Sequence, residues 1–135
     1  MNSAEITELL LGIPFLDGGR TCAGADCYGL LMIFAKELGV DLPDMEYERG
    51  WAERGANYLM ENAHGCADEI SKEELEPGDV IMFETYPGVA SHVGIFIGED
   101  RFIHTTDKHG AIAQHLSHQP YCRRINSFFR LKRAL

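Results

Sequence analysis

The N-terminal part of the chain carries apolar side chains at helical spacing in two places. Residues 3–11 predict a short helix, for which Ser3 is the candidate N-cap. Residues 27–38 predict a stronger helix, because their leucine, isoleucine and phenylalanine side chains recur on one face. Asp26 is placed to cap the start of this second helix, and Gly39 is placed to end it in the left-handed conformation.

The C-terminal half has the alternating pattern of β-strands instead. The predicted strands are Val80–Glu84, His92–Ile97, Arg101–Thr105, Ala111–Leu116 and Phe128–Lys132. Short turns at Gly98–Asp100 and Lys108–Gly110 predict antiparallel hairpins. Because helices come first and strands second, the sequence predicts an α+β fold, with N-terminal helices packed on one face of a C-terminal antiparallel β-sheet.

Three further segments have weaker patterns. Residues 17–25 are rich in glycine and predict a loop before the second helix. Residues 46–62 predict a more polar helix, which Gly50 and Gly55 interrupt. Ser71–Glu74 fits a capping box and predicts a single helical turn. Nothing divides the 135 residues, so we expect a single domain, 1–135.

The charge balance narrows the classes of function. With 12 basic and 21 acidic residues, the formal net charge of −9 argues against nucleic acid as a partner. No apolar run reaches membrane-spanning length, and the acidic N-terminal segment is unlike a signal peptide. We therefore expect synthesis in a cytoplasm, with the four cysteines reduced and no membrane insertion. The cysteines form no C-x-x-C pair, which argues against structural zinc or a redox motif.

Cys27 is the candidate nucleophile. It lies at the predicted start of the second helix, where the helix dipole and a nearby imidazolium are expected to lower the pKa of its thiol. Its backbone N–H is a candidate oxyanion donor, and the surrounding glycines would let a substrate backbone approach closely. The alternative is an ordinary buried cysteine that packs as a small apolar side chain, and position alone favours neither.

Two histidines favour the catalytic interpretation. His92 opens one predicted strand and His104 closes the next, so a hairpin folded at residues 98–100 brings them close together. One histidine can then accept the thiol proton while the other fixes its tautomer. The alternative is that both are ordinary histidines at strand ends. The presence of Cys27 in the same small domain makes this alternative less favourable. The three histidines between 109 and 118 fit surface loops better than a metal site, so neither metal nor cofactor is predicted.

The order of several short motifs resembles that of the NlpC-type cysteine peptidases of bacterial cell walls, which are papain-like hydrolases. The likeness covers about residues 10–133. Its motifs are Pro14–Gly19, Asp26–Leu30, Pro77–Val80, His92–Ile95, Phe102–His104 and Phe129–Leu131. Each motif alone is weak evidence, but their order and spacing together are specific. The resemblance implies a papain-like, NlpC-type fold.

The resemblance also implies roles for the residues. Cys27 corresponds to the nucleophile, His92 to the base, and His104 to the third residue that orients His92. The family's substrate is the peptide stem of peptidoglycan, commonly cut between D-glutamate and diaminopimelate. A cysteine endopeptidase acting on these stem peptides is therefore the leading hypothesis.

The candidate substrate-binding residues are neighbours of the nucleophile. Arg20 lies in the glycine-rich loop, where its charge suits a substrate carboxylate. Asp26 and Tyr28 flank Cys27, and we expect them to line the substrate site with Arg20.

Two positions depart from the family pattern. Many members have a tyrosine where this chain has Phe15, so one hydroxyl contact is missing here. Many secreted members have a serine where this chain has Tyr28. Together with the segment Gly39–Pro43 and the absence of a signal-like leader, Tyr28 resembles the branch found in bacteriophage tail proteins. This likeness predicts a phage or prophage tail peptidase that acts at the cell wall, with other tail proteins as partners.

Two other classes of function stay open. One is a tail-assembly or wall-binding protein that keeps the fold with little activity, and such a protein gains nothing from a low-pKa thiol. The other is an amidase or acyltransferase with the same Cys-His pair, because a thioester can be resolved by water or by another nucleophile.

Overall fold

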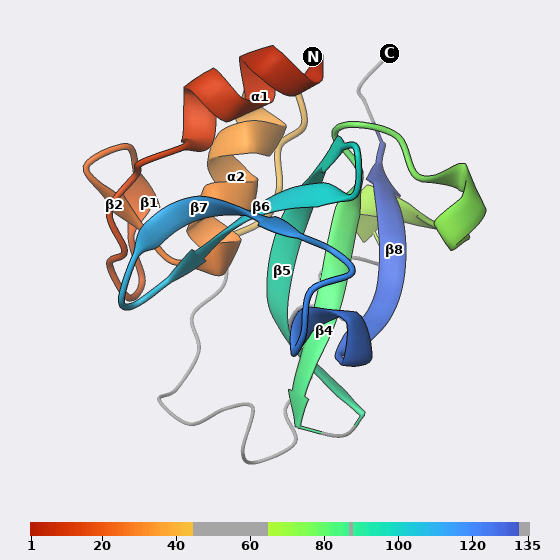
Figure 1. Cartoon of the computed structure of the whole chain (residues 1–135). Coiled ribbons are helices and arrows are strands. Elements are labelled where there is room, and N and C mark those ends of the chain that lie inside the picture. The colour runs from red at the N-terminus through yellow and green to blue at the C-terminus, as the bar shows by residue number, and fades with distance from the viewer. Residues whose placement is uncertain (45–64, 87, 133–135) are drawn as a thin grey trace.

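The computed structural model describes residues 1–44, 65–86 and 88–132 (Figure 1). Two α-helices come first, α1 (Ser3–Leu10) and α2 (Cys27–Glu37), and two short 3-10 helices follow later, η1 (Lys72–Glu74) and η2 (Tyr121–Arg123). The weaker helix predicted for residues 46–62 lies outside the described residues. Neither α-helix of the described part has the length and hydrophobicity of a membrane span.

The ends of the helices follow from local chemistry. The N-cap of α1 is Asn2 rather than the predicted Ser3. Asn2 Oδ1 accepts the Glu5 N–H at 2.9 Å, and the Glu5 carboxylate accepts the Asn2 N–H in turn. Asp26 caps α2 as predicted, with its carboxylate accepting the Gly29 N–H. Gly39 follows the end of α2 with φ +77°, the left-handed conformation predicted for it.

Six antiparallel strands form the main sheet, in the order β3-β8-β4-β5-β6-β7. Their bounds are β3 (Ala67–Ile70), β4 (Val80–Tyr86), β5 (Val89–Gly98), β6 (Arg101–Thr106), β7 (Gly110–His115) and β8 (Ile125–Leu131). The five predicted strands are all present, with ends shifted by up to three residues, and the predicted α+β fold class is confirmed. β3, a short strand that pairs with β8 at the sheet edge, was not predicted from the sequence.

The segment expected to be a loop, residues 17–25, contains a small hairpin of β1 (Arg20–Thr21) and β2 (Gly24–Ala25). This hairpin packs tightly on the first turn of α2. A Cβ added to Gly29 would lie 2.0 Å from the Gly19 carbonyl oxygen, so these backbones can meet only without side chains. The glycines before and after Cys27 therefore have an internal packing role.

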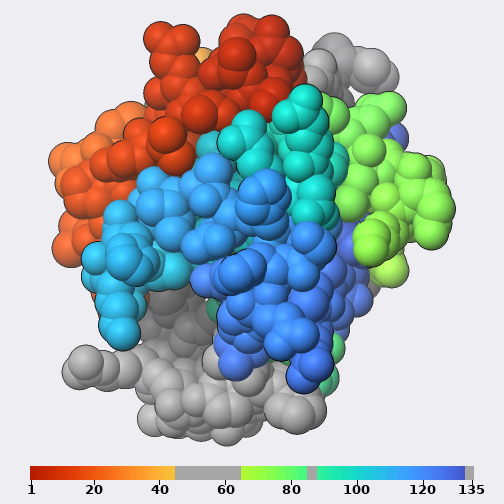
Figure 2. Space-filling model, in the orientation of Figure 1, coloured from red at the N-terminus to blue at the C-terminus, as the bar shows by residue number. Residues whose placement is uncertain are grey.

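The two faces of the sheet carry different clusters. Aliphatic side chains fill the face on which α1 and α2 pack, here called the aliphatic face; they include Val80, Val93, Ile95 and Ile103. The opposite, aromatic face carries a smaller cluster built on Ile81, Phe83, Phe102 and Leu116, with Tyr121 of η2 packed against it. Figure 1 shows both helices together on one side of the sheet, and Figure 2 shows the β6–β7 hairpin, in light blue, on the surface below the N-terminal segment.

Candidate functional site

The Cys27 thiol lies where α2 meets strand β5. Cys27 is the first residue of α2, and its sulfur accepts hydrogen bonds from the backbone N–H groups of Tyr28 and Val93. Val93 immediately follows His92 on β5. The fold therefore brings the predicted nucleophile to the stretch of backbone that carries the predicted base, His92, which lies 65 positions further along the sequence.

His92 and His104 contact each other directly. The His92 Nε2 and His104 Nδ1 atoms are 2.8 Å apart, and the two rings meet edge to face at an angle of 79°. The pairing of β5 with β6 runs on β5 from Gly98 to Ile95, so both histidines lie beyond the end of this ladder. Because Nε2 of His92 is engaged by His104, Nδ1 is the ring nitrogen left to exchange a proton with a thiol. The predicted pairing of the two histidines is confirmed.

The His104 ring is enclosed by aromatic rings. It is completely buried, with its centroid 4.8 Å from that of Phe102 and 4.9 Å from that of Tyr121. Among the described residues, its second nitrogen, Nε2, finds no hydrogen-bond partner. Neutral imidazole fits such an apolar enclosure better than imidazolium does. Tyr121 was not identified from the sequence, because η2 is far from both histidines along the chain and has no pattern of its own.

Burial sets the proton affinities of this site. It raises the pKa of the Cys27 thiol to about 12, and the neighbouring Asp26 carboxylate acts in the same direction. Burial also lowers the pKa of His92 to about 3, aided by His104, and that of His104 to about 4. The expectation of a thiol with a lowered pKa is therefore wrong for the free protein. Desolvation is the largest cause of the raised pKa of Cys27, and these directions favour a neutral thiol with a neutral imidazole in the resting protein.

Strand alternation separates the side chains of neighbouring residues on β5. Val93 belongs to the aliphatic cluster against which Cys27 packs, whereas His92 pairs across the sheet with Phe83 and faces the aromatic cluster. The thiol and the His92 ring therefore come from different faces of β5.

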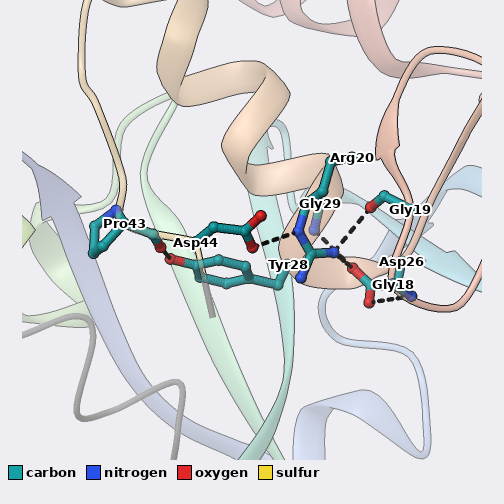
Figure 3. Close-up of polar contacts among 8 residues, drawn as sticks. All are labelled: Gly18, Gly19, Arg20, Asp26, Tyr28, Gly29, Pro43 and Asp44. Carbon is teal, nitrogen blue, oxygen red and sulfur yellow. Dashed lines mark hydrogen bonds and ion pairs between the residues drawn. The ribbon is translucent and has the colours of Figure 1, made fainter. Parts of the chain in front are cut away.

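The three predicted substrate-binding residues contact one another (Figure 3). Arg20 forms an ion pair with Asp26, and its guanidinium lies 5.5 Å from the centre of the Tyr28 ring. The Tyr28 hydroxyl donates a hydrogen bond to the Pro43 carbonyl, and Arg20 Nε donates to Asp44 at 2.8 Å. The network joins the β1–β2 hairpin, the start of α2 and the segment before residue 45. The role of these residues in substrate binding stays a prediction.

Outside this site, the histidines at 109, 115 and 118 are exposed. The nearest carboxylate contact among them joins His115 Nδ1 to Asp100 Oδ2 at 3.9 Å. Within the described ranges, no group of three histidine, cysteine or acidic side chains has the arrangement of a metal site.

A cysteine at a helix N-terminus against a histidine-bearing antiparallel sheet is the layout of papain-like folds. The model of the NlpC/P60 family matches residues 12–130. The chain is 32% identical over 113 residues to gamma-DL-glutamyl hydrolase of Bacillus subtilis. The aligned stretch covers 82% of this chain and 24% of that protein. It is 28% identical over 116 residues to murein DD-endopeptidase MepS/murein LD-carboxypeptidase of Escherichia coli K12, which covers 85% of this chain and 54% of that protein.

Solved structures show the same likeness. An NLP/P60 family protein from Staphylococcus aureus aligns with a TM-score of 0.71 and 25% identity over 97% of this chain and 40% of its own. The NlpC/P60 domain of the peptidoglycan hydrolase SagA aligns with a TM-score of 0.67 at 19% identity, over 95% of this chain and 97% of its own, and supports the fold alone. The chain belongs to the NlpC/P60 family. It spans about a quarter to about half the length of the two curated relatives described above.

Proposed function

We propose that the protein is a cysteine endopeptidase that hydrolyses peptidoglycan stem peptides. The observation that carries the proposal is the hydrogen bond from the Val93 N–H to the Cys27 sulfur, which brings the thiol to the residue that follows His92, whose ring is held by His104. Family membership supports the same chemistry, since the relatives are named as an endopeptidase and a glutamyl hydrolase.

In the proposed reaction, His92 Nδ1 accepts the thiol proton as the Cys27 sulfur attacks the carbonyl carbon. Because the thiol and the imidazole start neutral, the proton moves from Cys27 to His92 during the attack rather than before it. Breakage of the scissile C–N bond then sends the proton from His92 to the leaving amine and leaves a thioester on Cys27. Water, deprotonated by His92, attacks the thioester, releases the carboxylate and restores the thiol.

The other parts of the site have supporting roles. The oxyanion of each tetrahedral intermediate would be held by the Cys27 backbone N–H, because the first turn of a helix has N–H groups without intrahelical acceptors. His104 keeps the His92 ring oriented by the 2.8 Å contact to Nε2. For Nδ1 of neutral His92 to act as base, Nε2 must carry the proton and donate it to His104 Nδ1.

The finer assignment is the bond between D-glutamate and diaminopimelate, cut by a phage or prophage tail protein with other tail proteins as partners. The name of the B. subtilis relative, a gamma-DL-glutamyl hydrolase, supports a glutamyl bond. The tail assignment rests on the family likeness of Tyr28 and the segment Gly39–Pro43. The hydrogen bond from Tyr28 to the Pro43 carbonyl shows that these two features are physically connected.

A specific observation also favours a second candidate function, a wall-binding or tail-assembly protein with little activity. Burial holds the Cys27 thiol neutral, and a protein that only binds needs nothing more reactive. Under this alternative, loss of the sulfur would leave binding to cell walls unchanged and no cleavage would be seen with the wild type.

The deciding experiment is incubation with purified peptidoglycan, followed by mass analysis of the released fragments. We expect new amino and carboxyl ends at one type of bond, and a complete loss of release in Cys27→Ala. Cys22→Ala is the matched control, because Cys22 is an exposed cysteine of the neighbouring hairpin, and it should cleave like the wild type. If Cys27→Ala released fragments as fast as the wild type, the cysteine peptidase proposal would be wrong.

A further inference from the structure

Arg20 and Asp26 form an ion pair directly beside the nucleophile (Figure 3). The Arg20 Nη1 and Asp26 Oδ1 atoms are 2.7 Å apart, and only 18% and 6% of these side chains are exposed. Asp26 Oδ1 also accepts the Gly29 N–H at 2.8 Å, and Oδ2 accepts the Gly18 N–H at 3.0 Å. The carboxylate is thus fixed as the cap of α2, one residue before Cys27.

A fixed carboxylate in this place is unfavourable for a thiol nucleophile. A negative charge close to a thiol disfavours the thiolate, and burial strengthens the effect because water screens it less. Asp26 and Arg20 accordingly act on the pKa of Cys27 in opposite directions, Asp26 raising it and Arg20 lowering it. The Asp26 carboxylate stabilises the start of α2, but its negative charge must be offset for the Cys27 thiol to ionise.

The guanidinium is held so that it can offset the charge. Arg20 Nε donates to Asp44 Oδ1 at 2.8 Å, and Nη1 donates to the Gly19 carbonyl at 2.9 Å. The guanidinium also packs over the ring of Tyr28. A planar group with contacts on its edge and on its face has little freedom to turn away from Asp26.

We propose that Arg20 is a positioning residue that neutralises Asp26, so that Asp26 can cap α2 without opposing ionisation of the Cys27 thiol. This inference rests on the proposed role of Cys27 as nucleophile. It predicts that loss of the Arg20 charge slows the reaction of the Cys27 thiol and that loss of the Asp26 charge speeds it. A pair that only stabilised the fold would give effects of the same sign.

The test measures the rate at which iodoacetamide, a neutral reagent, alkylates Cys27 at pH 8, with peptide mass mapping to separate the four cysteines. Arg20→Gln should slow alkylation about tenfold, because one nearby charge shifts a pKa by about one unit or more. Asp26→Asn should speed it by a similar factor while keeping an oxygen for the Gly29 N–H. The double variant should return close to the wild-type rate.

Arg130→Gln is the matched control. Arg130 forms an equivalent pair with the buried Asp79, at 2.9 Å between Nη2 and Oδ2, but this pair joins β8 to the start of β4 rather than lying beside Cys27. Its removal should lower the melting temperature and leave the alkylation rate of Cys27 unchanged. If Arg20→Gln does not fold, Arg20→Lys carries the test, and it should keep a rate within about threefold of the wild type.

The proposal is overturned if Arg20→Gln leaves the rate unchanged, if Arg20→Gln and Asp26→Asn both slow alkylation, or if Arg20→Lys slows it as much as loss of the charge is expected to. The rates report the reactivity of the Cys27 thiol and not the cleavage of a substrate. A wild-type protein that released no peptidoglycan fragments would contradict the proposed function but would not alter this result.

Discussion

On strand β5, Val93 and Ile95 pack beneath α2, whereas His92 faces Phe83 and His104 on the other side of the sheet. The aliphatic face is filled mainly by hydrocarbon side chains, and it holds the helices in place. The aromatic face is smaller and carries the two histidines. The sheet thus separates most of the packing that stabilises the fold from the two histidines that we propose for its chemistry, whereas Cys27 packs on the aliphatic face at the N-terminus of α2.

The strongest expected effect comes from the two reacting groups. Cys27→Ala and His92→Ala should each abolish fragment release from peptidoglycan, and the double variant should be no worse than either, because the residues act as one unit. A further readout tests whether the Cys27 thiol meets the His92 ring. Alkylation of Cys27 should shift the NMR signal of His92 Nδ1 much more than that of His104 Nε2. Equal or absent shifts would place the thiol away from His92.

Substitutions of His104 should have an intermediate effect. His104→Asn should keep more activity than His104→Ala, since an amide can still hydrogen-bond His92 Nε2. The expected order of cleavage rates is wild type, His104→Asn, His104→Ala, then the baseline of the Cys27 variant. Because His104 is completely buried, alanine also leaves a cavity, so the rates should be compared at a temperature where circular dichroism shows every variant folded. Identical rates for His104→Ala and the wild type would exclude an orienting role.

A substitution on the aliphatic face should affect stability instead. Ile95 is 1% exposed, so Ile95→Ala should lower the free energy of unfolding by about 2–4 kcal/mol, whereas Ile95→Val should cost about 1 kcal/mol. Urea titration measures both. Folded Ile95→Ala should cleave peptidoglycan at close to the wild-type rate below its unfolding transition. A large loss of activity in fully folded Ile95→Val would show that the two faces are not separate in function.

At neutral pH the smallest effect is expected from titration of the two histidines, because it changes stability only as the pH falls. The pKa values of His92 and His104 fall to about 3 and 4 in the folded protein, below the ordinary value of 6.5. Between the folded and unfolded pKa values, the two histidines bind more protons in the unfolded chain than in the folded protein. Their contribution to stability is therefore complete above about pH 6.5 and is lost as the pH falls toward 4. Melting temperatures should therefore fall less steeply between pH 6.5 and pH 4 in His104→Gln than in the wild type. Parallel curves would contradict the burial of a neutral His104.

Features that depend on near neighbours could be predicted from the sequence. The Asp26 cap, the Gly39 end and the turn at Gly98–Asp100 each need only a few adjacent residues, and the structure contains all three. The pairing of His92 with His104 followed from counting across one hairpin. The α1 cap was misplaced by one residue because Asn2 and Ser3 are both good caps, and only the chain direction entering the helix distinguishes them.

The chain alone was enough to predict where helices and strands form, which residues could react, and which family the motifs resemble, because all of these depend on patterns that are continuous along it. The chemical state of those residues depends on the folded arrangement. The pKa of Cys27 rises because packing between α2 and β5 takes its thiol partly out of water, and Arg20 is paired with Asp26 because the β1–β2 hairpin folds back on α2. Desolvation and ion pairing depend on what lies nearby in space, which no local pattern of residues contains.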